Sequence, residues 1–218
     1  MSYRDPLPVT KPLKSLAGLL KLADRRARGP SPTFGTAHFL FAFMTIGEKG
    51  TIGRHALASH TGLGGGAVRT VIKKLREEGY AGANASGSFL TPAGSRVYDS
   101  VLRKLSPMVT LQGTQLTMGG FQVAVAIRSK GRLVLRGIEQ RDWAIRVGAA
   151  GATTYVIRAD KFTVPGGSSD CERDFPSKTW SALRSGLKPK NGDSVILCGA
   201  QDETTAKLGA LSAAVTLL

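Results

Sequence analysis

The chain has 218 residues, enough for two domains of about 100 residues each, and its 42% hydrophobic and 21% charged residues are ordinary for a globular protein. Its 30 Lys and Arg outnumber its 15 Asp and Glu, which gives a formal net charge of +15. Such an excess favours a polyanionic partner, either a nucleic acid or an anionic membrane face, with a general solubility role as the alternative. No apolar run approaches the roughly 20 residues of a transmembrane helix, so a membrane partner is not expected.

The cysteine content argues against two classes of small stabilised domain. Cys171 and Cys198 are the only cysteines, and no cluster of His and Cys surrounds either of them. A disulfide framework and a zinc site are therefore not expected, and no metal or other cofactor is predicted. The first residues lack the apolar segment of a signal peptide. We expect a cytoplasmic protein.

The positive charge is concentrated in the first half of the chain. Residues 1–105 contain 16 basic and 6 acidic side chains, whereas residues 106–218 contain 14 and 9. The net charges are +10 and +5, so anion binding is expected mainly in the first half.

The first predicted segment, residues 1–32, comprises a Pro-rich arm and a helix over residues 13–27. The helix has a basic end and a strong terminator in Gly29-Pro30. Those basic residues suit either phosphate contact or the negative end of the helix dipole. Thr36 is a plausible N-cap for the apolar segment that follows.

The next segment, residues 33–105, predicts a winged helix-turn-helix. Its pattern gives a buried helix over residues 37–46, a short strand at Thr51-Ile52, a helix over 53–61, a turn, and a helix over 65–78. A hairpin then follows, with its turn at residues 84–87 and strands on either side. Thr91-Pro92 predicts an N-cap and first residue of a further helix, which would bury Val97, Val101, Leu102 and Leu105.

The helix over residues 65–78 has two chemically different faces. Val68, Ile72 and Leu75 form an apolar stripe, and the three- and four-residue spacing puts Arg69, Lys73 and Arg76 opposite to it. A helix of this kind fits the major groove of DNA, where Arg can pair with guanine and Lys can contact phosphates. The predicted DNA-binding residues are Arg54, Gly65, Gly66, Arg69, Thr70, Lys73, Lys74 and Arg76.

Some features of this segment fit DNA binding less directly. The hairpin turn holds no Lys or Arg, although Arg96 and Arg103 follow it. Gly64, Gly65 and Gly66 weaken the helix start but leave backbone amides open to a phosphate. The alternative is a solvated helix face in which Lys73 and Lys74 pair with the acids that follow, or a winged helix that binds another protein.

Residues 106–218 predict a C-terminal α/β sandwich, so the chain as a whole is of the α+β class. The expected strands are residues 121–128, 152–158, 161–164 and 194–199, and the expected helices are 138–147, 175–185 and 204–217. This β-α-β-β-α-β-α order matches a ferredoxin-like split β-α-β arrangement, with a small doubly wound sheet as the alternative. The small residues of the last helix suit close packing on a sheet or on a second subunit.

A second candidate site lies in the C-terminal half. Glu139, Arg141 and Asp142 cluster at a helix start and could hold a small ligand. The alternative is an internal ion-pair network with an acid favourably placed in the first turn. No His follows His60, which removes the commonest general base from this half, and no catalytic residues are predicted.

Residues 29–34, the run 62–75 and the stretches 137–144 and 151–154 together resemble an archaeal family of winged-helix proteins. Members carry a C-terminal domain of unknown function, of the DUF4443 type, and are described as transcription regulators. The resemblance extends over roughly residues 13–217. It implies an archaeal cytoplasmic DNA-binding protein, and it carries over no catalytic residue or ligand.

We therefore predict a regulator that binds double-stranded DNA sequence-specifically and is not an enzyme. It is expected to act as a homodimer, because such modules pair to span two half-sites, and to respond through its C-terminal half to an unidentified small-molecule effector. The alternatives are an enzyme fused to a winged helix and a protein-interaction scaffold.

Overall fold

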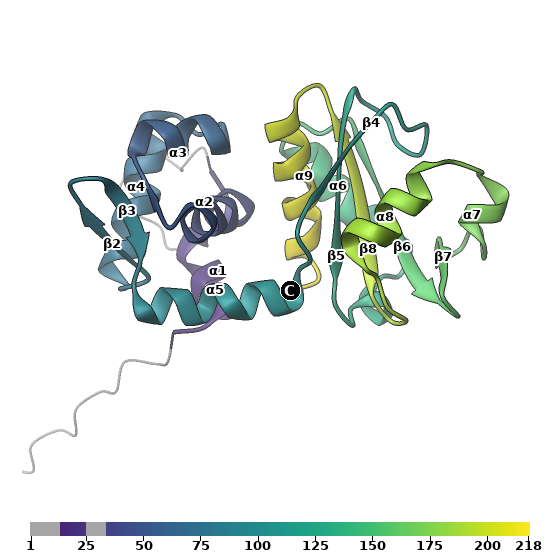
Figure 1. The fold of residues 1–218 in the computed structure, drawn as a ribbon, viewed down its shortest axis with the longest axis horizontal. Coiled ribbons are helices and arrows are strands. Elements are labelled where there is room, and N and C mark those ends of the chain that lie inside the picture. Colours follow the sequence, from purple (N-terminus) through teal and green to yellow (C-terminus); the bar gives the residue numbers. More distant parts are fainter. Residues whose placement is uncertain (1–13, 25–33) are drawn as a thin grey trace, which may run out of the picture.

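The computed structural model describes residues 14–24 and 34–218 (Figure 1). The Pro-rich arm, the predicted basic end of the first helix and the Gly29-Pro30 terminator lie outside the described residues. The elements of the first half are α1 (Leu16–Asp24), α2 (Thr36–Lys49), β1 (Thr51–Ile52), α3 (Arg54–Thr61), α4 (Gly65–Glu77), β2 (Ala81–Asn84), β3 (Gly87–Leu90) and α5 (Pro92–Lys104).

The elements of the second half include one short 3-10 helix, η1. They are β4 (Val109–Gln112), β5 (Phe121–Ile127), η1 (Gly131–Leu133), α6 (Ile138–Arg146), β6 (Gly151–Arg158), β7 (Lys161–Thr163), α7 (Cys171–Asp174), α8 (Thr179–Leu187), β8 (Ser194–Ala200) and α9 (Glu203–Val215).

Helix α2 is the central helix of the first half. Its side chains Phe39, Leu40 and Phe43 are fully buried, as the apolar run predicts. Thr36 is the first helical residue, and Gly35 before it is the N-cap. The helix ends at Gly50, whose φ of 71° is one that favours glycine. Helices α1, α3, α4 and α5 all pack against this helix.

A small antiparallel sheet completes the first half, with strand order β1-β3-β2. The Asn84 side chain closes the β2–β3 turn by accepting hydrogen bonds from the amides of Ser86 and Gly87. After β3, the Thr91 hydroxyl accepts a hydrogen bond from Gly94 N at 3.0 Å, and Pro92 is the first residue of α5. This confirms the predicted cap.

The second half contains a five-stranded sheet in the order β4-β5-β8-β6-β7, with every neighbouring pair antiparallel. The predicted ferredoxin-like pairing is wrong. It would insert β7 between β5 and β6, whereas β8 lies there. The doubly wound alternative is also wrong, because its strands would be mostly parallel. Chain order alone does not decide which strand fills the gap of a split β-α-β unit.

Helices cover both faces of this sheet, which makes the second half a three-layer sandwich (Figure 1). Val125 and Ile196 face α6 and α9 in one buried cluster. On the other face Tyr155, Phe162 and Trp180 stack edge-to-face or tilted within a second cluster that includes α8. The alternation of buried residues between faces follows from the pleat of the strands.

Helix α9 joins the two halves, since it packs on the sheet with one side and on α2 with the other. A Cβ at Gly209 would meet Cys198 Sγ at 2.5 Å and Ala149 Cβ at 2.9 Å, so the small residues of α9 allow close approach to the sheet. The cluster on this side runs without interruption from the first half into the second.

Three details differ from the predictions. Strand β4 was not predicted. The helix expected over residues 175–185 begins four residues later, as α8 at Thr179, and a separate short helix, α7, precedes it at Cys171–Asp174. Leu102, predicted to be buried, is 43% exposed. Within residues 14–24 and 34–218, every helix is too short or too polar to cross a membrane.

Candidate nucleic-acid interface

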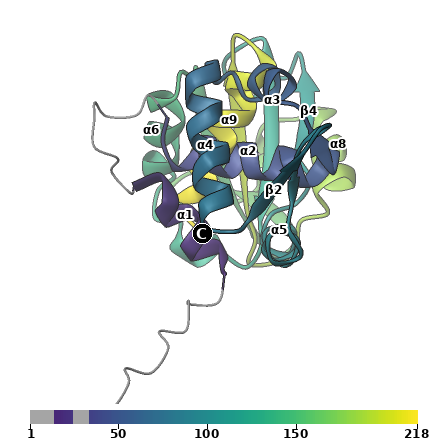
Figure 2. The ribbon, with the colours of Figure 1, turned by 90° about the vertical axis from the view of Figure 1, so that its left-hand side faces the viewer.

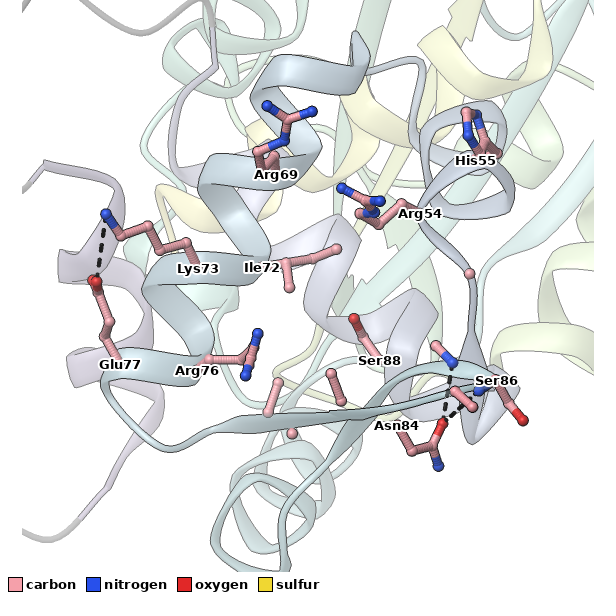
Figure 3. Close-up of a pocket in the computed structure, with 16 residues that line it drawn as sticks. Arg54, His55, Arg69, Ile72, Lys73, Arg76, Glu77, Asn84, Ser86 and Ser88 are labelled. Carbon is pink, nitrogen blue, oxygen red and sulfur yellow. Dashed lines mark hydrogen bonds and ion pairs between the residues drawn. The ribbon is translucent and has the colours of Figure 1, made fainter.

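A groove of about 1000 Å³ lies between α4, the start of α3 and the β2–β3 hairpin (Figure 3). Its basic lining residues are Arg54, Arg69, Lys73 and Arg76. Residues 81–88 of the hairpin form the opposite wall with small and uncharged side chains. Figure 2 shows α4 and the hairpin together on the face of the first half that points away from the second half.

The two faces of α4 explain why its basic residues point outward. Val68, Val71 and Leu75 are fully buried, and they fix the helix on the core of the first half. Arg69 and Arg76 lie on the exposed side, as helical spacing predicts. Ile72 is mostly buried and also lines the groove floor, which was not predicted.

Arg54 comes from a different element and completes the cationic lining. It is the first residue of α3, and its guanidinium reaches toward the Arg69 side of the groove (Figure 3). Two guanidinium groups gathered in one groove repel each other, and an anion between them relieves that repulsion. Prediction from α4 alone could not bring these residues together, because β1 and the following turn position α3.

Lys73 and Glu77 form an ion pair at 3.7 Å along α4, and Glu77 is the one acid among the described residues that line the groove. Both side chains are largely exposed, so this i, i+4 pair is worth about 0.3–0.5 kcal/mol. This pairing was one of the alternatives to DNA binding. It is weak enough for a phosphate to displace Glu77 from Lys73.

Lys74 does not belong to the groove, although the sequence predicted it there. Its ammonium donates a hydrogen bond to Leu22 O of α1 at 3.1 Å and lies 5.9 Å from the centre of the Phe39 ring. The residue sits at the border of the buried face, where α1 covers it. These contacts brace α1 against α4, and the DNA contact of Lys74 stays a prediction.

Thr70 also differs from its predicted role. Its hydroxyl donates a hydrogen bond to Gly66 O at 3.1 Å, and the side chain is half-buried and outside the groove lining. Back-bonding of this kind is common for Thr within helices.

The start of α4 leaves its backbone open. Gly64 is the N-cap and provides no side-chain hydrogen bond, and a Cβ at Gly65 or Gly66 would meet nothing within 4 Å. The first amides of a helix have no intrahelical acceptor, and their partial positive charge favours an anion. Glycines here therefore keep access to those amides unobstructed.

The other basic residues of the first half are spread over different surfaces. His55 lines the groove beside Arg54, whereas His60 lies in a separate cleft, with Nδ1 2.8 Å from Ala56 O. Arg96 and Arg103 are exposed on α5 and do not line the groove. The hairpin tip carries no cation, as the sequence indicates.

The second candidate site, on α6, lies far along the chain from this groove and forms no part of it. Arg141 and Asp142 pair with each other at 3.0 Å and are about half exposed, and Glu139 occupies the first turn. This arrangement agrees with the structural alternative of an ion pair and a favourably placed acid. Among the described residues, no group of three or more His, Cys, Asp and Glu could hold a metal ion.

Known proteins resemble this chain in the sequence of its second half and in the fold of most of its length. The second half matches a domain of unknown function. The match to that family, DUF4443, spans residues 118–217. The hypothetical protein PH0730 from Pyrococcus horikoshii OT3 has a similar fold, with a TM-score of 0.69 and 23% sequence identity over 84% of this chain and 92% of that chain. No curated protein matches the chain. The likeness concerns the fold alone.

Proposed function

We propose that this protein is a transcription regulator that binds double-stranded DNA sequence-specifically through a winged helix-turn-helix. In this proposal α2, α3 and α4 form the three-helix unit, α4 is the recognition helix, and the β2–β3 hairpin is the wing. The observation that carries the proposal is the groove lined by Arg54, Arg69 and Arg76, where Glu77 is the single acid in the part of the chain that the structure describes.

The chemistry of the groove suits a phosphodiester backbone beside an exposed helix. Arg69 and Arg76 project from one side of α4, and the major groove of B-DNA, about 12 Å wide, admits a helix. The open amides at Gly65 and Gly66 and the start of α3, where Arg54 lines the groove, provide two helix N-termini that favour an anion. Because the wing carries no cation, the contacts with phosphates that supply affinity would come from the helices.

A homodimer is part of the proposal. Ile138 and Ile145 are exposed and two turns apart on α6, and the opposite charges of Arg141 and Asp142 lie between them. A two-fold interface pairs a surface with itself, so a helix face carrying both charges can satisfy them in a second copy. Pairing through the second half would present two α4 helices to two half-sites. Sedimentation equilibrium measures this state directly.

The experiment that tests the function selects bound fragments from the genomic DNA of the source organism. A regulator of this kind enriches a shared motif, and its affinity for that motif exceeds its affinity for random duplex about 10³-fold or more. Arg69→Ala should lower the preference for the motif, because Arg reads bases, whereas Lys73→Ala should weaken all duplexes alike. Recovery of unrelated fragments with equal affinity would contradict sequence-specific binding.

A further inference from the structure

A second cavity, here called the junction cleft, opens where the two halves meet. It has a volume of about 630 Å³ and is lined by residues of α2, α3, α5, α9 and the segment leading into β4. Its volume lies within the range of about 300–1,000 Å³ typical of small-molecule sites, which occur preferentially between structural units. The groove on α4 shares no lining residue with it.

One wall of the junction cleft is apolar. Met44, Tyr98 and Met108 line it, and Leu102 adds an aliphatic side chain that is 43% exposed. Gly47 makes this wall possible, because a Cβ there would meet the Tyr98 ring at 2.6 Å. The ring therefore lies flat along α2. Flexible methionines on both sides can adjust to an apolar ligand.

The polar lining is predominantly cationic. Among the described residues, the charged side chains of the lining are Lys49, Lys207 and one acid, Glu48, which pairs with Lys49 at 3.7 Å, and His60 adds an imidazole. Glu203 holds Lys207 at 2.7 Å from outside the lining. The Lys49–Glu48 pair is exposed and weak, so an incoming carboxylate can replace Glu48. Lys207 can keep Glu203 and still donate to a ligand, because an ammonium has three donors.

Other polar groups of the cleft further restrict the chemical class of the ligand. The Thr45 hydroxyl donates to Phe41 O at 2.9 Å, and the Ser106 hydroxyl donates to Pro107 O at 2.8 Å. Both are already committed within the chain. The pKa of Tyr98 is raised by burial and by the charges of Glu48 and Asp99, so its phenol stays protonated and can donate to an anion.

We propose that the junction cleft binds a small organic acid, with its hydrocarbon body against Met44, Tyr98 and Met108 and its carboxylate near Lys49 and Lys207. The ligand class is an aromatic or aliphatic monocarboxylate. Phosphate-rich ligands such as nucleotides fit less well, because the apolar wall would face their polar groups.

Ligand binding here would couple the two halves. Residues of α2 and α5 come from the first half, while Met108 and Lys207 come from the second, so one ligand contacts both. Helix α2 also packs against α3 and α4, which carry the groove. The binding claim stands apart from the proposed function, and only an effect on DNA affinity rests on it.

The four methionines provide the test. Met44 and Met108 line the junction cleft, and Met118 does not. Protein labelled with ¹³C at the methionine methyl groups is titrated with 4-phenylbutyrate, decanoate and indole-3-carboxylate, each to about 10 mM, ten times a weak Kd of about 1 mM. We expect the Met44 and Met108 signals to shift with saturation for at least one acid, while Met118 stays in place.

Variants and a neutral probe test the acid class. Where 4-phenylbutyrate binds, 4-phenylbutanamide should bind about 10-fold more weakly, and Lys207→Gln should remove that difference. Leu102→Asp should weaken the acid at least 10-fold, whereas Leu135→Asp, at an exposed residue outside the cleft, should not change it. Equal binding of acid and amide, shifts of all methionines together, or no shift with any acid would overturn the proposal.

Discussion

Adjacent lysines on α4 have different surroundings and different roles. Lys73 is exposed at the groove and weakly paired with Glu77, whereas Lys74 donates to Leu22 O and sits over the Phe39 ring. Helical spacing predicts both to be near the exposed face, since they are consecutive. Their roles differ because α1 lies against Lys74, which donates to its Leu22 carbonyl.

Replacing each lysine should therefore affect a different property. Lys74→Ala removes a hydrogen bond from a charged donor and a cation–π contact, so we expect a loss of about 1–2 kcal/mol in the free energy of unfolding with unchanged duplex affinity. Lys73→Ala should leave stability within about 0.5 kcal/mol and weaken duplex binding. Urea unfolding and fluorescence anisotropy measure the two properties. The reverse assignment of effects would place Lys74 at the DNA.

At the scale of single residues, the sequence identified Arg54 and the cations of α4 but not the uncharged wall beside them. Periodicity placed Arg69 and Arg76 outward, because Val68 and Leu75 can only be buried. The groove wall formed by residues 81–88 carries no charge, and no residue pattern marked it as part of a site. The junction cleft was missed because its lining comes from five separate segments.

Among the elements, α9 begins at a cap that depends on one carboxylate. Asp202 accepts a hydrogen bond from Thr205 N at 2.8 Å and one from the Thr205 hydroxyl at 2.7 Å. These bonds, the backbone amide first, lower the pKa of Asp202. Stabilisation of this kind is fully present above the unfolded-state pKa of about 3.9 and is lost as the pH falls through the lower folded-state value.

Asp202→Ala should cost about 1 kcal/mol in the free energy of unfolding at neutral pH. The difference from wild type should shrink as the pH falls from about 5 toward 2, because protonation removes the same bonds from the wild-type protein. Asp202→Asn retains a neutral cap and serves as the control. Urea unfolding at several pH values checks this, and a difference that stays constant with pH would contradict the role of the carboxylate.

Element types were more predictable than their pairing. Helix α2 follows from its apolar run. The hairpin turn and the cap of α5 follow from local signals around Asn84 and at Thr91, which act within a few residues. Strand β4 was missed, whereas β2 and β3, of the same length, were predicted because a turn signal lies between them. The position of β8 between β5 and β6 depends on contacts far apart in the sequence, which no local pattern records.

For the molecule as a whole, the shared core predicts cooperative unfolding. One buried cluster extends from α2 through α9 to the sheet, so neither half can lose its packing without exposing the other. Trp143 and Trp180 both lie in the second half, and their fluorescence reports on that half, whereas far-UV circular dichroism reports on all helices. We expect the two transitions in urea to coincide. Separate midpoints would show that the halves unfold independently.

The central claim is that the α4 groove holds duplex DNA, and its salt dependence tests that claim most directly. Anisotropy with a duplex from about 50 to 200 mM salt should give a log–log slope near −0.9 per phosphate contacted. Replacing Arg54, Arg69 and Arg76 with Ala should weaken binding and flatten that slope. The same change at three exposed arginines of the second half removes equal charge, and it should alter neither the affinity nor the slope strongly. These arginines are Arg132, Arg136 and Arg158. Equal losses from both triple variants, or no duplex binding at about 50 mM salt, would contradict the account.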